Sequence, residues 1–347
     1  MRLFTSALCT TIAIGLLAGC VGNMSAPSAT VPSIDSQSRP ISVDGDTAPP
    51  QALTVLHALV PDRKRKKPPS GIYVSLFGGT DILGYPANNK GNKGPTCTVT
   101  GVSSVNDVAV DGKGNLMDPD GGSGYLMLFK GPGMCGKSLG VIADSYGQPS
   151  DASSLDAATG KIALGNIRDK SSSNGSLSVC TLKAGCTANL TNADMYEAGG
   201  VAMANNGDCW VDAKPTSSGG AALIYFKGCA GAGKIATGFK STYYGDIDID
   251  NSGHLVIIDE MALAVYIYSG CTPKCKVIGG PFSLKAESFF GKLNKANTDY
   301  AAVDRTDGVV DVYSFSEKGI KYEYEFSKGL TASLAPEGVA QNPRSKQ

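Results

Sequence analysis

One strand-and-turn pattern recurs along the chain with a period near 46 residues, and this repeat constrains the fold more than any other feature. Its clearest copy is "DIDIDNSGHLVIIDEMALAVYIYS" at 246–269. It contains a short alternating strand, a turn with Asp, Asn and Gly, a second strand, and a third strand that ends in aromatic residues. A fourth strand follows, as in "KCKVIGG" at 274–280. Short strands in repeats of this length predict an all-β fold, the β-propeller.

The third strands set the number of blades. Their ends are predicted at Tyr85, Phe129, Cys180, Phe226, Tyr268 and Phe315. Residues 72–101 supply only three strands, but "PEGVAQNP" at 336–343 matches the first strand of another repeat, "GGVAMANN" at 199–206. We therefore predict a six-bladed propeller of four-stranded blades over residues 71–343. The C-terminal strand completes the first blade, because an open ring would leave exposed sheet edges.

The blade pattern, "VAVDGKGNL" at 108–116 followed by "YLMLF" at 125–129, resembles the NHL-repeat and gluconolactonase-like propellers. The resemblance covers roughly residues 72–343 and is architectural, because short strands and glycines recur in all propellers. Gluconolactonase-type enzymes bind a divalent cation at the axial mouth through carboxylate and amide oxygens, which suit a hard cation. The ligand motifs of that family have no residue-by-residue match here, so the metal is not carried over.

The axial mouth is the candidate binding site, because the innermost strands of a propeller begin around its central channel. Alignment of the repeats places five polar residues at these strand starts: Glu337, Asn106, Asp107, Asp151 and Asp246. They form a predicted acidic arc. Two interpretations stay open: the side chains cap solvated strand starts, or they bind a divalent cation.

Two charged residues occupy an inner-strand position that is Ala or Ser in the other blades. They are Asp248 and Lys292, in the fifth and sixth blades. An unpaired charge near the crowded axis is strongly destabilising, so we predict an ion pair between them that bridges the two blades. The alternative is that each side chain reaches the solvent-filled channel alone.

The chain has two histidines, and neither is expected to do chemistry. His254 ends the turn between the first two strands of its blade, where Asn115, Lys161 and Asp208 hold the equivalent positions. Turn chemistry explains residues of this kind. His57 precedes the repeats. The sequence also lacks Gly-x-Ser-x-Gly, Walker and His-Glu-x-x-His motifs, so no catalytic constellation is evident.

Eight cysteines follow Cys20, and an exported chain favours disulfides. Three pairs are predicted across hairpins or adjacent strands: Cys180–Cys186, Cys209–Cys229 and Cys271–Cys275. A zinc site would need paired cysteines to converge, whereas each pair here has its own hairpin, so no metal site is predicted. Cys97 and Cys135, which start fourth strands in neighbouring blades, are left as either paired or free.

Residues 1–19 are predicted to be a lipoprotein signal peptide. Arg2 is its charged region, and the apolar segment 7–19 is short for a membrane span. "LAGC" at 17–20 resembles the bacterial lipobox, which implies acylation of Cys20 and a firm anchor of two or more chains such as palmitate. The alternative is an ordinary secretory signal. Val21, in place of Asp, favours the outer membrane if the host has two membranes.

Residues 20–70 are rich in Ser, Pro and Thr and lack apolar periodicity, so a disordered tether is predicted. Its basic run, "RKRKK" at 63–67, is interpreted as solvated charge in a linker. Attraction to anionic lipid headgroups or to the cell wall is the alternative.

The balanced net charge limits the kinds of partner that the chain is expected to bind. The chain has 31 basic and 31 acidic residues, which removes the electrostatic case for nucleic acid as a partner. We expect a monomeric, lipid-anchored binding or scaffold module of the bacterial cell envelope, with no cofactor. Its partner would be an envelope protein, a glycan or a small molecule. The alternative is a cation-dependent lactonase or hydrolase that acts at the acidic arc.

Overall fold

The computed structural model describes residues 71–77, 80–103, 106–111, 114–121, 123–130, 137–155 and 160–342, with the backbone alone over 149–155. Several sequence predictions lie outside the described residues: the signal peptide, Cys20, the tether with its basic run, His57 and Cys135. Within the part of the chain that the structure describes, no helix has the length and apolar character needed to cross a bilayer.

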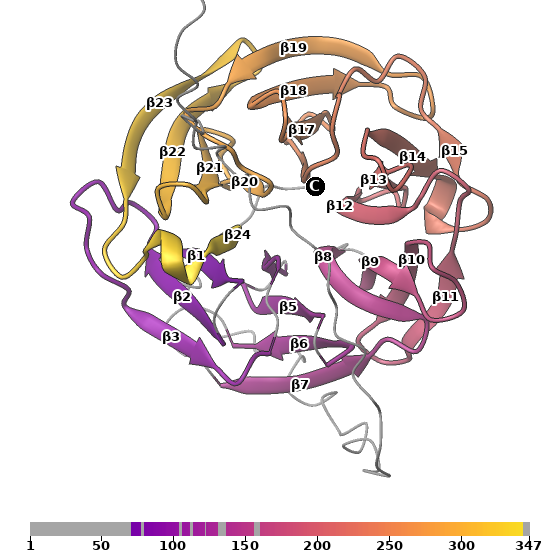
Figure 1. The fold of residues 1–347 in the computed structure, drawn as a ribbon, viewed down its shortest axis with the longest axis horizontal. Coiled ribbons are helices and arrows are strands. Elements are labelled where there is room, and N and C mark those ends of the chain that lie inside the picture. Colours follow the sequence, from indigo (N-terminus) through magenta and orange to yellow (C-terminus); the bar gives the residue numbers. More distant parts are fainter. Residues whose placement is uncertain are drawn as a thin grey trace, which may run out of the picture. The chain divides into compact units, whose positions relative to one another are not determined.

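The described residues form six four-stranded antiparallel sheets around a central axis (Figure 1). From the inside outward, blade 1 contains β24 (Pro336–Asn342), β1 (Gly71–Leu76), β2 (Asp81–Pro86) and β3 (Cys97–Thr100). Blade 2 contains β4 (Ala109–Val110), β5 (Leu116–Asp120), β6 (Tyr125–Phe129) and β7 (Ser138–Ala143). Blade 3 contains β8 (Gly147–Leu155), β9 (Lys161–Asp169), β10 (Ser176–Thr181) and β11 (Gly185–Leu190).

The second half of the ring repeats this arrangement. Blade 4 contains β12 (Glu197–Met203), β13 (Cys209–Lys214), β14 (Ala222–Phe226) and β15 (Lys234–Ile235). Blade 5 contains β16 (Ile247–Ile249), β17 (Leu255–Asp259), β18 (Ala264–Ser269) and β19 (Lys276–Ser283). Blade 6 contains β20 (Gly291–Leu293), β21 (Asp299–Asp304), β22 (Val309–Ser316) and β23 (Gly319–Phe326). Within the described residues, two short 3-10 helices lie in connections: η2 (Lys227–Cys229) and η3 (Ala332–Leu334). The predicted six-bladed propeller is confirmed.

The ring closes through blade 1, as predicted. β24 pairs with β1 in an antiparallel register that sets Val339 opposite Val74 and Ala340 opposite Tyr73. Figure 1 shows the yellow C-terminal strand beside the indigo first strand. The C-terminal strand therefore supplies the innermost strand of a blade whose other three strands come from residues 71–100.

The hydrophobic core lies between the blades. Six clusters of buried apolar side chains each join two adjacent blades, including one that joins blade 6 to blade 1. β17 shows why its sequence is continuously apolar rather than alternating. Leu255 and Ile257 pack toward blade 4, whereas Val256 and Ile258 pack toward blade 6. Because successive strand residues point to opposite faces, a strand between two blades must be apolar on both.

Neighbouring inner strands approach closely enough to require glycine. Gly200 of β12 donates its N–H to the carbonyl oxygen of Gly245 at 2.9 Å, which joins blades 4 and 5 directly. A Cβ on Gly200 would lie 2.4 Å from that oxygen. Gly338 is restricted in the same way, because a Cβ there would lie 2.6 Å from the Cα of Asp107. The inner strands of these adjacent blades are therefore packed backbone against backbone.

The turns between first and second strands use one repeated device. Asp250 Oδ1 accepts the backbone N–H of His254 at 2.8 Å, and its other oxygen contacts the imidazole. Asp111 accepts the backbone N–H of Asn115 at 2.8 Å and its side-chain amide at 2.9 Å. The equivalence of His254 and Asn115 inferred from the repeat is confirmed.

All three predicted disulfides are present: Cys180–Cys186, Cys209–Cys229 and Cys271–Cys275. The first and third span the turns between third and fourth strands, and the second joins the start of β13 to η2. Cys97 is also disulfide-bonded. Two bridges thus close turns beside the outermost strands, whereas Cys209–Cys229 lies in the core between blades 3 and 4.

The closure predicts a large effect of a small truncation. Deleting residues 335–347 removes β24, all of whose residues are buried, and exposes the apolar faces of blades 1 and 6. We expect a loss of about 4 kcal/mol or more in the free energy of unfolding, measured by urea denaturation. Deleting only 343–347 is the control and should change little. Equal midpoints for the two truncations would contradict the closing role of β24.

Candidate functional site

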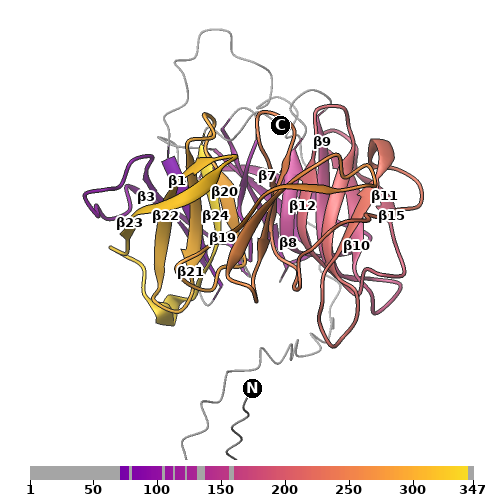
Figure 2. The same ribbon diagram turned by 90° about the horizontal axis from the view of Figure 1, so that it is seen from above.

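The mouth face is defined here as the end of the ring at which the innermost strands begin. Second strands run antiparallel to the innermost ones, so β1, β17 and β21 end at this same face. The loops that follow these strands, and the connections that precede β16, β20 and β24, therefore gather around the mouth. Figure 2 shows the strands running between the two faces of the ring.

Four of the five predicted arc residues have described side chains, and all four are buried. They are Asn106, Asp107, Asp246 and Glu337, each at most 8 % exposed. Asp151 lies in β8, but its side chain is outside the described residues. The interpretation of these four side chains as solvated caps is therefore wrong, because they lie inside the ring.

Lys292 pairs with an arc residue. Its ammonium forms an ion pair with Asp246 and contacts the carbonyl oxygen of Ile247 at 3.3 Å. Asp248, the partner predicted from sequence, accepts the backbone N–H groups of Ile249 at 2.8 Å and Leu293 at 2.7 Å. The prediction identified the right blades but the wrong aspartate. Backbone amides already engage Asp248, and the long lysine side chain reaches toward the strand start.

The charges around Lys292 explain its protonation. Burial lowers the pKa of Lys292, but Asp246, Asp107 and Asp248 together outweigh it and hold that pKa above the ordinary lysine value. Burial raises the pKa of Asp246 to about 6, although Lys292 opposes the shift. The two shifts are compatible, because several carboxylates surround one ammonium. The chain thus supplies a positive charge to the arc, which weakens the electrostatic case for a divalent cation at Asp107 and Asp246.

A second ionisable group, the Glu–Arg cluster, lies at the mouth face of blades 5, 6 and 1. It consists of Glu260 after β17, Glu287 before β20, Arg305 after β21 and Glu337 in β24. Arg305 Nε lies 3.1 Å from Glu337 Oε2, and its Nη1 lies 3.9 Å from Glu260 Oε1. Two carboxyl groups therefore share one guanidinium, and Glu287 contacts the first of them, Glu260.

The excess of carboxyl groups over cations keeps protons in this cluster. Burial is the main cause that raises the pKa of Glu260 to about 8, and Glu287 adds to it while Arg305 opposes it. Burial likewise raises the pKa of Glu337 to about 7 against the effect of Arg305. Sequence reasoning found only Glu337, because the alignment compared inner strands alone. A charged residue directly after a second strand was the missed signal.

Exposed apolar side chains surround the same part of the mouth face. Phe77 follows β1, Leu334 lies in η3 before β24, and Met261 and Leu263 lie between β17 and β18. Met261 is 69 % exposed. The remaining large apolar residues that are exposed in the described chain lie on outermost strands: Ile235, Ile278 and Tyr322. Among the described residues, the exposed large apolar side chains of the two ring faces therefore lie at the mouth face of blades 1 and 5.

Blade 4 contributes an aromatic group to the mouth face. Lys214, the last residue of β13, forms an ion pair with Glu197 at 3.1 Å. Its ammonium lies 5.6 Å from the ring centroid of Tyr196. Tyr244 donates its hydroxyl to Glu197 at 3.1 Å and contacts the ring of Tyr243. The charges of this group are satisfied internally, and its rings remain partly exposed.

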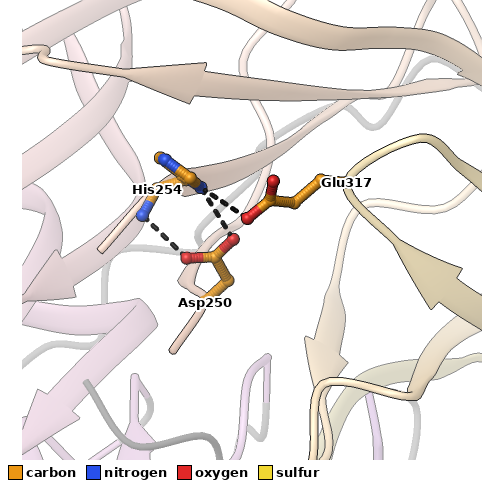
Figure 3. A group of neighbouring side chains, drawn as sticks. All are labelled: Asp250, His254 and Glu317. Carbon is orange, nitrogen blue, oxygen red and sulfur yellow. Dashed lines mark hydrogen bonds and ion pairs between the residues drawn. The ribbon is translucent and has the colours of Figure 1, made fainter. Parts of the chain in front are cut away.

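The face opposite the mouth contains the one histidine of the described chain (Figure 3). His254 Nδ1 lies 3.0 Å from Asp250 Oδ2 and 3.3 Å from Glu317 Oε1. Asp250 and His254 come from the β16–β17 turn of blade 5, whereas Glu317 comes from the β22–β23 turn of blade 6. The repeat explained Asp250 and His254 as turn residues, but it could not place Glu317, because that contact crosses between blades.

Comparison with known proteins supports the fold alone. No family model matches the sequence, and no curated protein matches it. A chain of the crystal structure of a nidogen/laminin complex is similar, with a TM-score of 0.59, 12% identity, and coverage of 78% of this chain and 98% of that one. The crystal structure of a protein of unknown function from Bacteroides caccae is similar with a TM-score of 0.55 and 11% identity, and the match covers 79% of this chain and 98% of that one. The crystal structure of a functionally unknown protein from Desulfotomaculum acetoxidans is similar with a TM-score of 0.52 and 12% identity, and the match covers 77% of this chain and 83% of that one.

The Lys292–Asp246 pair predicts that replacing both residues destabilises the fold by less than the sum of the two single replacements. Lys292→Met leaves a buried carboxylate without its ammonium and should destabilise the fold by about 3–5 kcal/mol in urea denaturation. Adding Asp246→Asn should recover part of that loss, because the uncompensated charge is removed. Lys295→Met, an exposed neighbour, is the control. Additive effects of the two substitutions would show that the pair is not coupled.

The Glu–Arg cluster predicts a stability that falls as pH rises. The folded-state pKa of Glu260, about 8, lies above its ordinary value of 4.5, so the folded protein binds more protons between these limits. Its contribution is favourable near pH 4.5 and declines up to pH 8, by at most about 1.4 kcal/mol per pH unit. Glu260→Gln should flatten the unfolding free energy across this range. Exposed Glu323→Gln should not, and an unchanged slope in Glu260→Gln would refute the assignment.

Proposed function

We propose that this chain is a lipid-anchored β-propeller of the bacterial cell envelope that binds a partner protein through its mouth face. One observation carries the proposal: exposed apolar side chains and the Glu–Arg cluster gather at that face on blades 5, 6 and 1. Exposed apolar residues grouped beside polar ones are typical of protein interaction sites.

The composition of the face favours a protein over the other partners considered. Met261 and Phe77 offer large apolar contacts, and methionine, aromatic residues and arginine are enriched in protein interfaces. The cluster has more carboxyl groups than guanidinium groups and retains protons, so a Lys or Arg of a partner segment would complement it by taking the place of those protons. A similar structure belongs to a nidogen/laminin complex, which supports an assembly role for this architecture.

The N-terminal segment supports the location. An acylated Cys20 and a tether of residues 20–70 would hold the propeller near the membrane. A disordered segment of that length has a root-mean-square span of about 40 Å. The propeller would then sample partners close to the membrane surface, which raises their effective concentration.

The lactonase or hydrolase alternative has less support. Its cation would have to bind at an arc where Asp246 already pairs with Lys292 and Glu337 pairs with Arg305. Two of the four carboxylates of the arc are therefore engaged by cations of the chain itself.

The test uses a photoreactive amino acid introduced at single positions of the full chain in a bacterial host. We expect covalent adducts with one envelope protein from Met261 and Leu334, at the mouth face. Ile278 and Tyr322, on outermost strands, are matched exposed controls and should give none. Equal adducts from all four positions, or adducts with glycan alone, would contradict the protein-binding proposal.

Localisation is tested in the same strain with Cys20→Ser. We expect the variant to lose acyl labelling and move from the membrane fraction to the soluble envelope fraction, with fewer mouth-face adducts. Unchanged membrane fractionation would show that Cys20 is not the anchor.

A further inference from the structure

We propose that Asp250, His254 and Glu317 form a site for a divalent metal ion of the zinc class, on the face opposite the mouth. Within the described chain, these three are the group of potential ligands whose donor atoms all lie within 4.8 Å of one another. Two come from blade 5 and one from blade 6, so a bound ion would join the blades (Figure 3).

The spacing of the donor atoms fits tetrahedral coordination. Zinc binds imidazole nitrogen and carboxylate oxygen at about 2.0–2.2 Å, so tetrahedral donors lie about 3.3–3.6 Å apart. His254 Nδ1 lies 3.3 Å from Glu317 Oε1 and 3.0 Å from Asp250 Oδ2. Small side-chain adjustments therefore suffice for an ion to enter between the three atoms.

Backbone hydrogen bonds orient one of the three ligands, the carboxylate of Asp250. Asp250 is buried, and its Oδ1 accepts the N–H groups of Ser252 and His254, each at 2.8 Å. The second oxygen is thereby fixed toward the imidazole. Hydrogen bonds that orient a carboxylate ligand in this way are a regular part of metal sites.

Turn formation alone does not account for the group. In blade 2, Asn115 completes the same turn on Asp111 through its amide. His254 keeps that bond through Nδ1, and the same ring nitrogen also faces a carboxylate of the next blade. One imidazole nitrogen between two carboxylates leaves an excess of negative charge, which a divalent cation would neutralise.

The donor set selects the kind of ion. One nitrogen and two oxygens suit zinc, whereas calcium and magnesium prefer oxygen ligands alone. Glu317 is half-exposed, so the fourth position faces solvent and water would complete the coordination. Three protein ligands with one open position is an arrangement that zinc adopts in proteins.

The test is Zn²⁺ titration of the full chain by isothermal calorimetry, together with thermal unfolding. His254→Asn copies the residue that blade 2 uses at this turn, so the fold should be preserved while a ligand is lost. Glu317→Gln removes the ligand of blade 6. Exposed Glu323→Gln on β23 is the control. Every variant keeps His57 and all the cysteines, so any Zn²⁺ binding by those residues is the same in each titration.

We expect one Zn²⁺ site in the parent chain and in Glu323→Gln, with binding at least 10-fold weaker in Glu317→Gln and abolished in His254→Asn. At a free Zn²⁺ concentration 100 times the Kd, the folding equilibrium constant of the parent should rise about 100-fold, with a higher Tm. Ca²⁺ should give no such shift. An isotherm for His254→Asn that matches the parent, or the absence of a micromolar site in the parent, would overturn the proposal.

Discussion

The pairing of β24 with β1 is the constraint on which the rest of the structure depends. The pairing fixes blade 1, and blade 1 contributes one side of two of the six apolar clusters. Without it, the buried faces of blades 6 and 2 would meet water, and the inner strands would lose the geometry that sets their charged residues around one channel. Closure also brings Glu337 beside Arg305, so the same pairing that completes the core assembles part of the mouth.

Crowding at the axis explains the charged residues found there. Inner strands approach so closely that glycine is required at Gly200 and Gly338, and a charge at this depth must find a partner within the ring. Lys292 lies near several carboxylates at once, and Arg305 pairs with two, Glu260 and Glu337. The mouth is therefore a set of shared charges rather than a row of independent acids, which accounts for carboxyl groups whose pKa values approach neutrality.

The repeat in the sequence was sufficient to predict the architecture, because a period of four strands, cysteines at hairpin ends and Asp-based turns are local features. It placed the C-terminal strand in blade 1, paired Cys209 with Cys229, and equated His254 with Asn115. It failed where contacts cross between blades. The partner of Lys292 depends on which carboxylates the backbone already engages, and Glu317 and Arg305 reach their neighbours from loops that an alignment of single blades cannot relate.

The closure has a temporal consequence. Phe77, which follows β1, donates its backbone N–H to Ala335 just before β24, and Ser75 contacts Gly338 across 263 residues of sequence. The apolar part of the mouth that contains Phe77 and Leu334 thus comes into being only when the last strand arrives. During synthesis the earlier blades are made first, and none of them alone presents this surface. A partner that recognises this surface would bind only chains in which β24 has been made and has paired with β1.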